Sequence, residues 1–447
     1  MLITNGTDLD LRPLTIRVRG GTIAEVGDHL LPVAGEDVVD AGGGTIIPGL
    51  HDHHIHLRAS AAALTSLQLG PPAVNDTDEL RRRLASAQPD STGWIRAIGY
   101  HESIAGDLDR QSIDRYRADV PVRVQHRSGA LWTVNSAGTR ALGGVDAGDG
   151  RFYRDDARFR EISAGSDLRA ISEKLSSMGV TGCTDATPDM SKADLDYFAE
   201  EVRSGRFVQA LNLLAANDGH HDRPFTFGPV KKILDDVDLD VDGLTAWITA
   251  THENGQAVAV HCVTRLQLVV ALVALRTAGG QQGDRIEHAA SVPAEIMADL
   301  AASGVTVVTQ PNFVGERGDR YRVDVPLPEH QDLWRTATLM NASVPVAGST
   351  DSPFGSSDPW ASMRSARDRL TADGHVLGPE ERVPARTALR MFLGHASDPS
   401  SPRNIVSGSR AHLCILDGPP TTVLEELSAD LVRTTVTDGE VVFTSPS

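Results

Sequence analysis

The sequence predicts an α/β fold: a (β/α)8 TIM-type barrel joined to a small β-sandwich domain that both chain ends form together. Three observations support this prediction. The middle of the chain alternates short apolar segments with helical ones, which is typical of a parallel sheet with crossover helices. Both ends have β character instead. The length of 447 residues suits one large domain with a smaller one beside it.

The two ends of the chain are predicted to be β-rich. Residues 14–19 alternate in strand fashion, Gly20-Gly21 marks a turn, and residues 22–26 form a second strand. Residues 411–417 and 433–443 are also predicted strands, the latter broken by a turn at residues 437–439. We therefore expect residues 1–47 and 397–447 to form one composite β-sandwich domain.

Residues 48–396 are predicted to form the barrel, with an insert near residues 58–165. More short apolar segments occur there than the eight strands of such a barrel, so one or two should lie outside it. The predicted strands are residues 49–57, 94–100, 122–126, 180–185, 208–214, 230–234, 257–262, 285–288, 306–310 and 344–348.

Composition and charge exclude several classes of protein. Hydrophobic residues make up 40% of the chain and charged residues 23%, so the chain can bury a core and is not disordered. The formal net charge of −18 argues against binding to nucleic acid or to anionic membranes. The three cysteines are far apart, so no disulfide framework is expected.

Targeting and assembly follow from similar observations. The longest apolar run, residues 268–275, is too short to span a membrane. The N-terminal residues lack the pattern of a secretory signal, so a cytoplasmic location is expected. The expected partner is a small-molecule substrate, and a homodimer is the assembly that base rates favour.

The run His51-Asp52-His53-His54-Ile55-His56 is the strongest candidate for chemistry. Side chains of a strand alternate between its faces, so Asp52, His54 and His56 share one face, opposite His51 and His53. Two imidazoles two residues apart can chelate one divalent metal, and Asp52 can orient a ligand or contact the metal. We predict His54 and His56 as metal ligands, and a fortuitous cluster at a polar strand end is the alternative.

Three later strands each end in a residue that can bind a metal. His261, His288 and Asp351 follow the predicted strand segments 257–260, 285–287 and 344–350. A single histidine after a strand more often has a structural role. Three strands that end in such residues, together with a His-x-His motif, favour a metal site, because catalytic residues gather at the C-terminal rim of a barrel. Imidazole and carboxylate ligands together suit Zn²⁺ and similar metals.

These residues lead to a resemblance. The segment from Pro48 to His56 resembles the first-strand signature of the amidohydrolase superfamily, and the three later strand ends resemble its remaining barrel ligands. Residues 408–417 and 437–443 resemble the family's C-terminal β-segment. Residues 93–100 and 134–136 resemble the branch called amidohydrolase family 3. The resemblance covers essentially the whole chain.

The resemblance implies a lysine ligand and a metal cofactor. Residues 228–236 resemble the segment that carries a lysine at a strand end, which in binuclear members is carboxylated and bridges two metals. Lys231 fits this position best, Lys232 is its rival, and two surface lysines are the alternative. Cys183 is either a substitute thiolate ligand or a buried core residue. The resemblance implies a divalent metal, Zn²⁺ by preference, with one or two ions per chain.

Gln310 with Pro311 resembles a seventh-strand motif of the same branch and is expected to contact substrate, and simply ending the strand is its alternative role. Tyr100 and Arg127 lie in the insert and are of types that can hold a polar or aromatic substrate, with ordinary surface contacts as the alternative. The chain departs from the family in the insert, where many relatives have a histidine closer to the pair Asn135-Ser136 than His126 is. Two extra imidazoles, at His51 and His53, have no counterpart in the family pattern.

The expected reaction is hydrolysis of a C–N bond in an amide or cyclic amide. A metal lowers the pKa of a bound water from 15.7 towards about 7. Asp351 is expected to take the proton of the attacking water and deliver it to the leaving nitrogen. The alternatives are a deaminase, an isomerase or a decarboxylase of the same superfamily. A scaffold protein without activity is the alternative from another class.

Overall fold

The computed structural model describes residues 1–71, 73–144, 148–155, 158–159 and 167–446. Contacts divide the chain into two compact units. The first consists of Met1–Leu57 and Ile171–Ser447, and the second of Arg58–Ala170. Parts of the predicted insert, including residues 160–165, lie outside the described residues.

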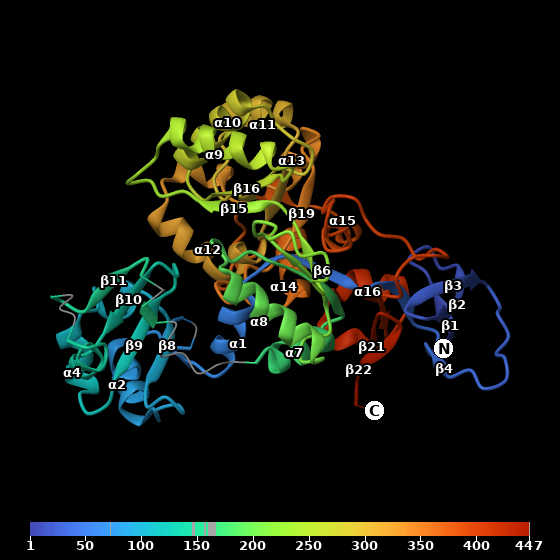
Figure 1. Ribbon diagram of the computed structural model, residues 1–447, viewed down its shortest axis with the longest axis horizontal. Coiled ribbons are helices and arrows are strands. Elements are labelled where there is room, and N and C mark those ends of the chain that lie inside the picture. The colour runs from blue at the N-terminus through green and yellow to red at the C-terminus, as the bar shows by residue number, and fades with distance from the viewer. Residues whose placement is uncertain (72, 145–147, 156–157, 160–166, 447) are drawn as a thin grey trace. The chain divides into compact units, whose positions relative to one another are not determined.

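Both chain ends contribute strands to one sheet of the first unit, and both termini lie there (Figure 1). The strand order is β22-β21-β20-β5-β1-β2-β3, with β4 paired to β1. The bounds are β1 (Leu2–Thr7), β2 (Pro13–Arg19), β3 (Thr22–Gly27), β4 (Val38–Asp40), β5 (Thr45–Pro48), β20 (Leu413–Leu416), β21 (Val432–Thr437) and β22 (Glu440–Thr444).

The sequence predicted two packed sheets here, whereas hydrogen bonding joins the strands into a single sheet. The strands β1–β4 on one side and β5 with β20–β22 on the other are joined through the pairing of β1 with β5. That pairing consists of one residue pair, Thr7 with Thr45. By contrast, β5 pairs with β20 along its whole length. One buried core nevertheless takes residues from both halves, including Ile16, Ile46 and Leu413.

Parallel strands form two further sheets in the first unit, with orders β14-β13-β12-β6 and β15-β16-β17-β18-β19. They are short and apolar, and Val258, Ala259 and Val260 of β16 are fully buried, as expected for strands covered on both faces. The bounds are β6 (Leu50–Ile55), β12 (Val180–Asp185), β13 (Ala210–Leu213), β14 (Thr226–Phe227), β15 (Val230–Ile233), β16 (Val258–Cys262), β17 (Arg285–His288), β18 (Thr306–Thr309) and β19 (Val346–Gly348).

Backbone hydrogen bonds also link these two sheets to each other at two places. The amide of Lys231 in β15 donates to the carbonyl of Leu214, just after β13, at 3.3 Å. On the other side, the amide of Asp351, after β19, donates to the carbonyl of His54 in β6 at 2.9 Å. Each sheet is therefore hydrogen-bonded to the other near both of its edges.

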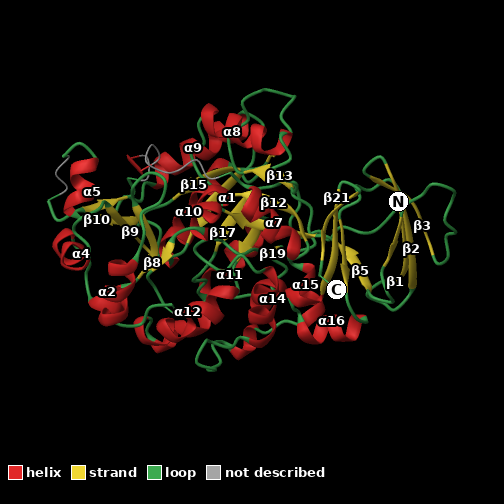
Figure 2. Ribbon diagram, turned by 90° about the horizontal axis from the view of Figure 1, so that it is seen from below, coloured by secondary structure: helices red, strands yellow, loops and turns green. Residues whose placement is uncertain are grey.

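Helices cover the outside of the parallel strands, and Figure 2 shows them around the strands of this unit. Helices α9 and α10 pack on each other and on β16. Helix α8 begins with a capping box, because the Ser191 hydroxyl accepts the Asp194 amide and the Asp194 carboxylate accepts the Ser191 amide. The bounds are α7 (Arg169–Ser177), α8 (Lys192–Arg203), α9 (Val241–Glu253), α10 (Arg265–Ala278), α11 (Met297–Ser303), α12 (Asn312–Asp324), α13 (Ala337–Asn341), α14 (Pro359–Asp368), α15 (Ala385–Arg390) and α16 (Pro420–Glu426). Helix α1 (Leu57–Leu64) begins at the last residue of the segment Met1–Leu57 of the first unit and otherwise belongs to the second unit.

The second unit has its own sheet, with order β11-β10-β9-β8-β7. Two predicted strands, residues 94–100 and 122–126, belong to it as β8 and β9, so they lie outside the parallel sheets of the first unit. No helix among the described residues is both long and apolar enough to cross a membrane. The bounds are β7 (Leu67–Gln68), β8 (Ile95–Tyr100), β9 (Val122–His126), β10 (Leu131–Val134), β11 (Arg151–Tyr153), α2 (Thr77–Ser86), α3 (Glu102–Ala105), α4 (Arg110–Tyr116) and α5 (Ser136–Ala141).

Candidate metal centre

The six predicted metal-binding residues all lie at or near the carboxyl ends of parallel strands in the first unit. Each approaches at least one of the others through a ring contact, a hydrogen bond or a short charge–charge distance. They are His54, His56, Lys231, His261, His288 and Asp351.

The carboxylate of Asp351 lies between the imidazoles of the His-x-His motif. Its Oδ1 is 3.6 Å from Nε2 of His54 and 3.4 Å from Nε2 of His56. On the other side, its Oδ2 is 3.9 Å from Nδ1 of His288. Burial raises the pKa of the Asp351 carboxyl, but His56 and the charge of His288 outweigh burial, so the net pKa lies below the ordinary value. Asp351 is therefore held as a carboxylate.

Lys231 and not Lys232 faces this group. The Nζ of Lys231 is 3.0 Å from Nε2 of His54, and the side chain is buried. Lys232 points elsewhere, with its Nζ 5.1 Å from the ring centroid of Trp247. Strand alternation explains the difference, because neighbouring residues of β15 point to opposite faces. Burial lowers the pKa of the Lys231 amine to about 8, so an appreciable fraction is neutral near pH 7.

His288 reaches the group through an unusual backbone. Its ring centroid is 4.7 Å from that of His54 and 4.5 Å from that of His261. The φ angle of His288 is 72°, and that of Asp351 is 55°. Residues other than glycine rarely adopt this left-handed conformation, which costs about 1–2 kcal/mol per residue. Both strained residues are predicted ligands, and backbone strain of this kind clusters at functional sites.

The residues present fit a divalent metal. Oδ1 of Asp351 is buried and accepts no hydrogen bond among the described residues, although two imidazoles face it. Two ligands bound about 2.1 Å from one tetrahedral metal lie about 3.4 Å apart. The distances of 3.4 and 3.6 Å from Asp351 to His56 and His54 match that separation. A divalent cation could bind this buried oxygen together with the two imidazoles that face it.

Glu287 and Arg285 were missed by the sequence analysis. Both side chains are buried, and the guanidinium of Arg285 binds both carboxylate oxygens of Glu287, at 2.7 and 3.1 Å. Oε2 of Glu287 in turn contacts Nδ1 of His54. The only available signal was the charged pair Arg-x-Glu within a short buried strand, where charged residues are rare unless paired.

Comparisons with known proteins identify the family. The sequence pattern described as "Amidohydrolase family" matches residues 37–443. The chain belongs to this family. The N-substituted formamide deformylase of Arthrobacter pascens is 26% identical over 519 residues, which cover 95% of this chain and 94% of that protein. The match confirms the resemblance to amidohydrolase family 3.

Solved structures show the same fold. An uncharacterized metal-dependent hydrolase of Pyrococcus horikoshii OT3 is 20% identical, with a TM-score of 0.75 over 95% of this chain and 98% of that chain. Atrazine chlorohydrolase TrzN of Arthrobacter aurescens TC1, solved with zinc, is 16% identical, with a TM-score of 0.57 over 98% of this chain and 94% of that chain.

The remaining residues of the histidine run divide as strand alternation predicts. The rings of His51 and His53 stack on each other at 4.5 Å. Within the described part of the chain, the hydrogen bonds of the Asp52 carboxylate come from backbone amides and from the Thr350 hydroxyl. The carboxylate accepts the amides of His54, at 3.2 Å, and Thr350, at 3.1 Å. It therefore orients His54 through the backbone and ties β6 to the residues after β19.

Gln310 lies against a predicted ligand in this amidohydrolase. It is fully buried, and its Oε1 is 2.8 Å from Nδ1 of His288. Its Nε2 donates to Oγ of Ser349 at 2.9 Å, so Oε1 is the atom left to accept from His288. A role in contacting substrate, as the sequence suggested, stays a prediction.

Two other predicted substrate contacts, Tyr100 and Arg127, belong to the second unit. Tyr100 is part of the buried core of that unit, and its hydroxyl donates to the carbonyl of Gly106 at 2.6 Å. The amide of Arg127 donates to the carbonyl of Tyr100 at 2.8 Å. Their contact with substrate stays a prediction.

Cys183 is buried in β12, and burial raises the pKa of its thiol well above the ordinary value. A thiol of that kind resists becoming the thiolate that a metal requires. None of the metal-competent clusters among the described residues includes it. The core role therefore fits its surroundings better than the ligand role.

The second unit has a cluster of His101, Glu102 and His126. Nε2 of each histidine approaches the Glu102 carboxylate, at 3.2 and 3.0 Å. Each Nδ1 accepts a backbone amide, from Ser103 at 3.2 Å and from Ser128 at 3.1 Å. A nitrogen that accepts an N–H carries no proton, so the neutral rings carry it on Nε2. They donate to Glu102 and are poor metal ligands.

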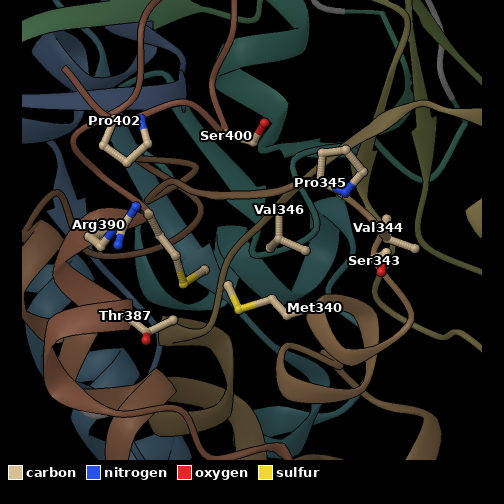
Figure 3. A pocket seen from close by; sticks show the side chains of 10 residues that line it. Met340, Ser343, Val344, Pro345, Val346, Thr387, Arg390, Ser400 and Pro402 are labelled. Carbon is tan, nitrogen blue, oxygen red and sulfur yellow. The ribbon is translucent and has the colours of Figure 1, made fainter.

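A hollow of about 430 Å³ lies away from the metal-binding set, and Figure 3 shows its lining. It includes Pro345 and Val346, at the start of β19, with Met340 and Arg390 nearby. Asp351 follows the opposite end of the same strand. Sheets of parallel strands bind ligands at the carboxyl ends of the strands, so this hollow at the other end of β19 is not the place to expect the chemistry.

Proposed function

We propose that this amidohydrolase is a metal-dependent hydrolase that cleaves a C–N bond in an amide or cyclic amide. The observation that carries the proposal is the buried Oδ1 of Asp351, which accepts no hydrogen bond among the described residues and lies beside His54 and His56. The names of the relatives support the reaction class, since they include a deformylase and an aminohydrolase, N-isopropylammelide isopropylaminohydrolase of Burkholderia multivorans.

We also propose the predicted architecture. The two parallel sheets would close into a (β/α)8 barrel formed by β6, β12, β13 and β15–β19. The hydrogen bonds from Lys231 to Leu214 and from Asp351 to His54 support closure at both seams. Residues 1–47 and 397–447 would form the composite β-domain, which the shared sheet of both ends supports. The insert would correspond to the second unit.

The ligands proposed for one metal are His54, His56 and Asp351, with His261 and His288 for a second. Lys231 is proposed as the bridge between them after carboxylation. In that reaction the neutral amine forms a C–N bond to CO₂ and releases a proton, which leaves an anionic carbamate. The lowered pKa of the amine, about 8, supplies the neutral form that this reaction needs.

A divalent metal bound here supplies Lewis acidity, which lowers the pKa of water and polarises a carbonyl. Asp351 is proposed to accept the proton of the attacking water and then to pass it to the leaving nitrogen. The pKa of the Asp351 carboxyl lies below its ordinary value, so the group is ionised near neutral pH, as a proton acceptor must be.

Metal analysis and a substrate panel test the proposal. Purified protein should contain Zn²⁺ or take it up, and should hydrolyse members of a panel of N-substituted formamides, N-acyl amino acids and cyclic amides. A chelator should abolish the activity, and added Zn²⁺ should restore it. Release of ammonia with one metal per chain, unchanged in Lys231→Ala, would favour a deaminase. Protein that neither contains nor takes up metal would contradict the proposal.

A further inference from the structure

The Arg285–Glu287 pair meets a metal-binding residue from across the parallel strands. Glu287 is in β17, whereas His54 is in β6, and these strands belong to different sheets. Oε2 of Glu287 contacts Nδ1 of His54. All three side chains are buried, so the contact is shielded from water, and a hydrogen bond there is electrostatically stronger than at the surface.

The direction of the hydrogen bond is set by the Arg285 guanidinium. Its Nε donates to Oε1 of Glu287 at 2.7 Å, and its Nη2 donates to Oε2 at 3.1 Å. A carboxylate in such a bidentate pair only accepts. Nδ1 of His54 must therefore be the donor and carry the proton.

The consequence lies on the other side of the ring. With the proton on Nδ1, the lone pair of neutral His54 is on Nε2. That nitrogen faces Nζ of Lys231 at 3.0 Å and Oδ1 of Asp351 at 3.6 Å. The tautomer that Glu287 selects is thus the one that can bind a metal at the proposed site.

Arg285 also fixes where Glu287 stands. Its Nη2 donates to the carbonyl of His53 at 2.8 Å, next to His54 in the chain. The Arg285 guanidinium therefore joins the β6 backbone, at the carbonyl of His53, to the Glu287 carboxylate. That carboxylate accepts the hydrogen bond from the ring of His54, which is in the same strand. This arrangement restrains both the position and the rotation of the His54 imidazole.

We propose that Glu287, held by Arg285, is a positioning residue that selects the Nδ1–H tautomer of His54 and presents Nε2 to the metal. This inference rests on the proposed metal-dependent function and deepens it. Carboxylate partners of metal-binding histidines raise ligand basicity, and their loss typically lowers metal affinity 10–100-fold.

The test compares Zn²⁺ affinity, measured by competition with a chelator, in the wild-type full chain and in Glu287→Gln. The amide cannot form the bidentate pair with Arg285, so affinity should fall 10–100-fold. Arg285→Lys keeps the Glu287 carboxylate but removes the guanidinium that donates to both of its oxygens. The Zn²⁺ affinity of this variant should also fall, but by less than in Glu287→Gln. Glu381→Gln is the matched control, because that buried carboxylate accepts the amides of Thr336 and Thr338 instead. Its Zn²⁺ affinity should equal that of the wild type.

A second readout separates positioning from simple destabilisation. Nitrogen NMR of metal-free protein labelled at histidine should show Nδ1 of His54 protonated in the wild type. In Glu287→Gln the Nε2–H form should become populated. Folded variants of Glu287 and Arg285 with wild-type Zn²⁺ affinity and an unchanged tautomer would overturn the inference alone. A wild-type protein that binds no divalent metal would instead overturn the proposed function.

Discussion

Replacing Asp351 with asparagine removes the group proposed to move the proton while leaving nearly the same shape. The amide oxygen can still lie near His56 and His54, where Oδ1 now stands at 3.4 and 3.6 Å. The amide does not accept a proton near neutral pH. Positioned general acid–base groups contribute about 10²–10⁴-fold to a rate. The variant should therefore lose about 3–5 kcal/mol of transition-state stabilisation.

The structure also indicates how much metal the variant should keep. The imidazoles of His54, His56, His261 and His288 remain, and Glu287 still contacts Nδ1 of His54. We expect measurable metal after Zn²⁺ is added in excess, together with a rate at least 100-fold lower. Metal content by mass spectrometry and kcat should be measured on the same sample, so that the rate is expressed per metal-loaded chain.

The matched control is Asp284→Asn. Asp284 is also a buried carboxylate, but it lies just before β17, at the opposite end of the parallel strands. It accepts the amide of Val258 at 2.9 Å and an N–H from His252. That variant should lose stability and keep its kcat per metal-loaded chain. A metal-loaded Asp351→Asn protein with a rate within twofold of the wild type would refute the reasoning about Asp351.

Three further predictions follow from individual contacts. Lys231→Ala should reduce bound metal from two equivalents to one or fewer, whereas Lys232→Ala should keep two, and equal metal content in both would contradict the proposed bridge. Gln310→Ala should weaken Zn²⁺ binding about 10–100-fold by releasing Nδ1 of His288, whereas a raised KM at unchanged metal affinity would support the substrate contact instead. Burial lowers the pKa of His412 to about 4, against an unfolded value of about 6.5, so its stabilising contribution is complete above pH 6.5 and is lost as pH falls towards 4. We therefore expect the unfolding free energy of the metal-free wild type to fall between pH 7 and pH 5 by about 2 kcal/mol more than that of His412→Gln. Urea denaturation at both pH values measures this difference, and an equal fall in the two proteins would contradict the prediction.

The part of the site that could be predicted from sequence depends on local geometry. Alternation along β6 separates His54 and His56 from His51 and His53, and the ring contacts agree with that division. The ends of apolar strands identify Asp351 in the same way, because parallel strands bring their carboxyl ends to one side. Alternation along β15 also separates Lys231 from its neighbour, once the strand bounds are known.

The part that could not be predicted depends on contacts between distant strands. Gln310 acquires its position through His288 and Ser349, which lie on strand ends remote in sequence. The joining of the end strands into one sheet depends on the single pair of Thr7 and Thr45. Neither feature has a periodicity that a sequence could display, because each is set by tertiary packing.

The left-handed backbone at His288 explains why Glu287 escaped sequence reasoning. In a regular strand, consecutive side chains point to opposite faces, so a histidine facing the site implies a glutamate facing away from it. Here Glu287 contacts His54, and the ring of His288 also lies 4.7 Å from that of His54. The φ of 72° at His288, followed by 48° at Ala289, ends the alternation and brings both side chains to the same imidazole. The backbone strain, about 1–2 kcal/mol per residue, thus lets one strand end supply both a ligand and the group that orients another ligand.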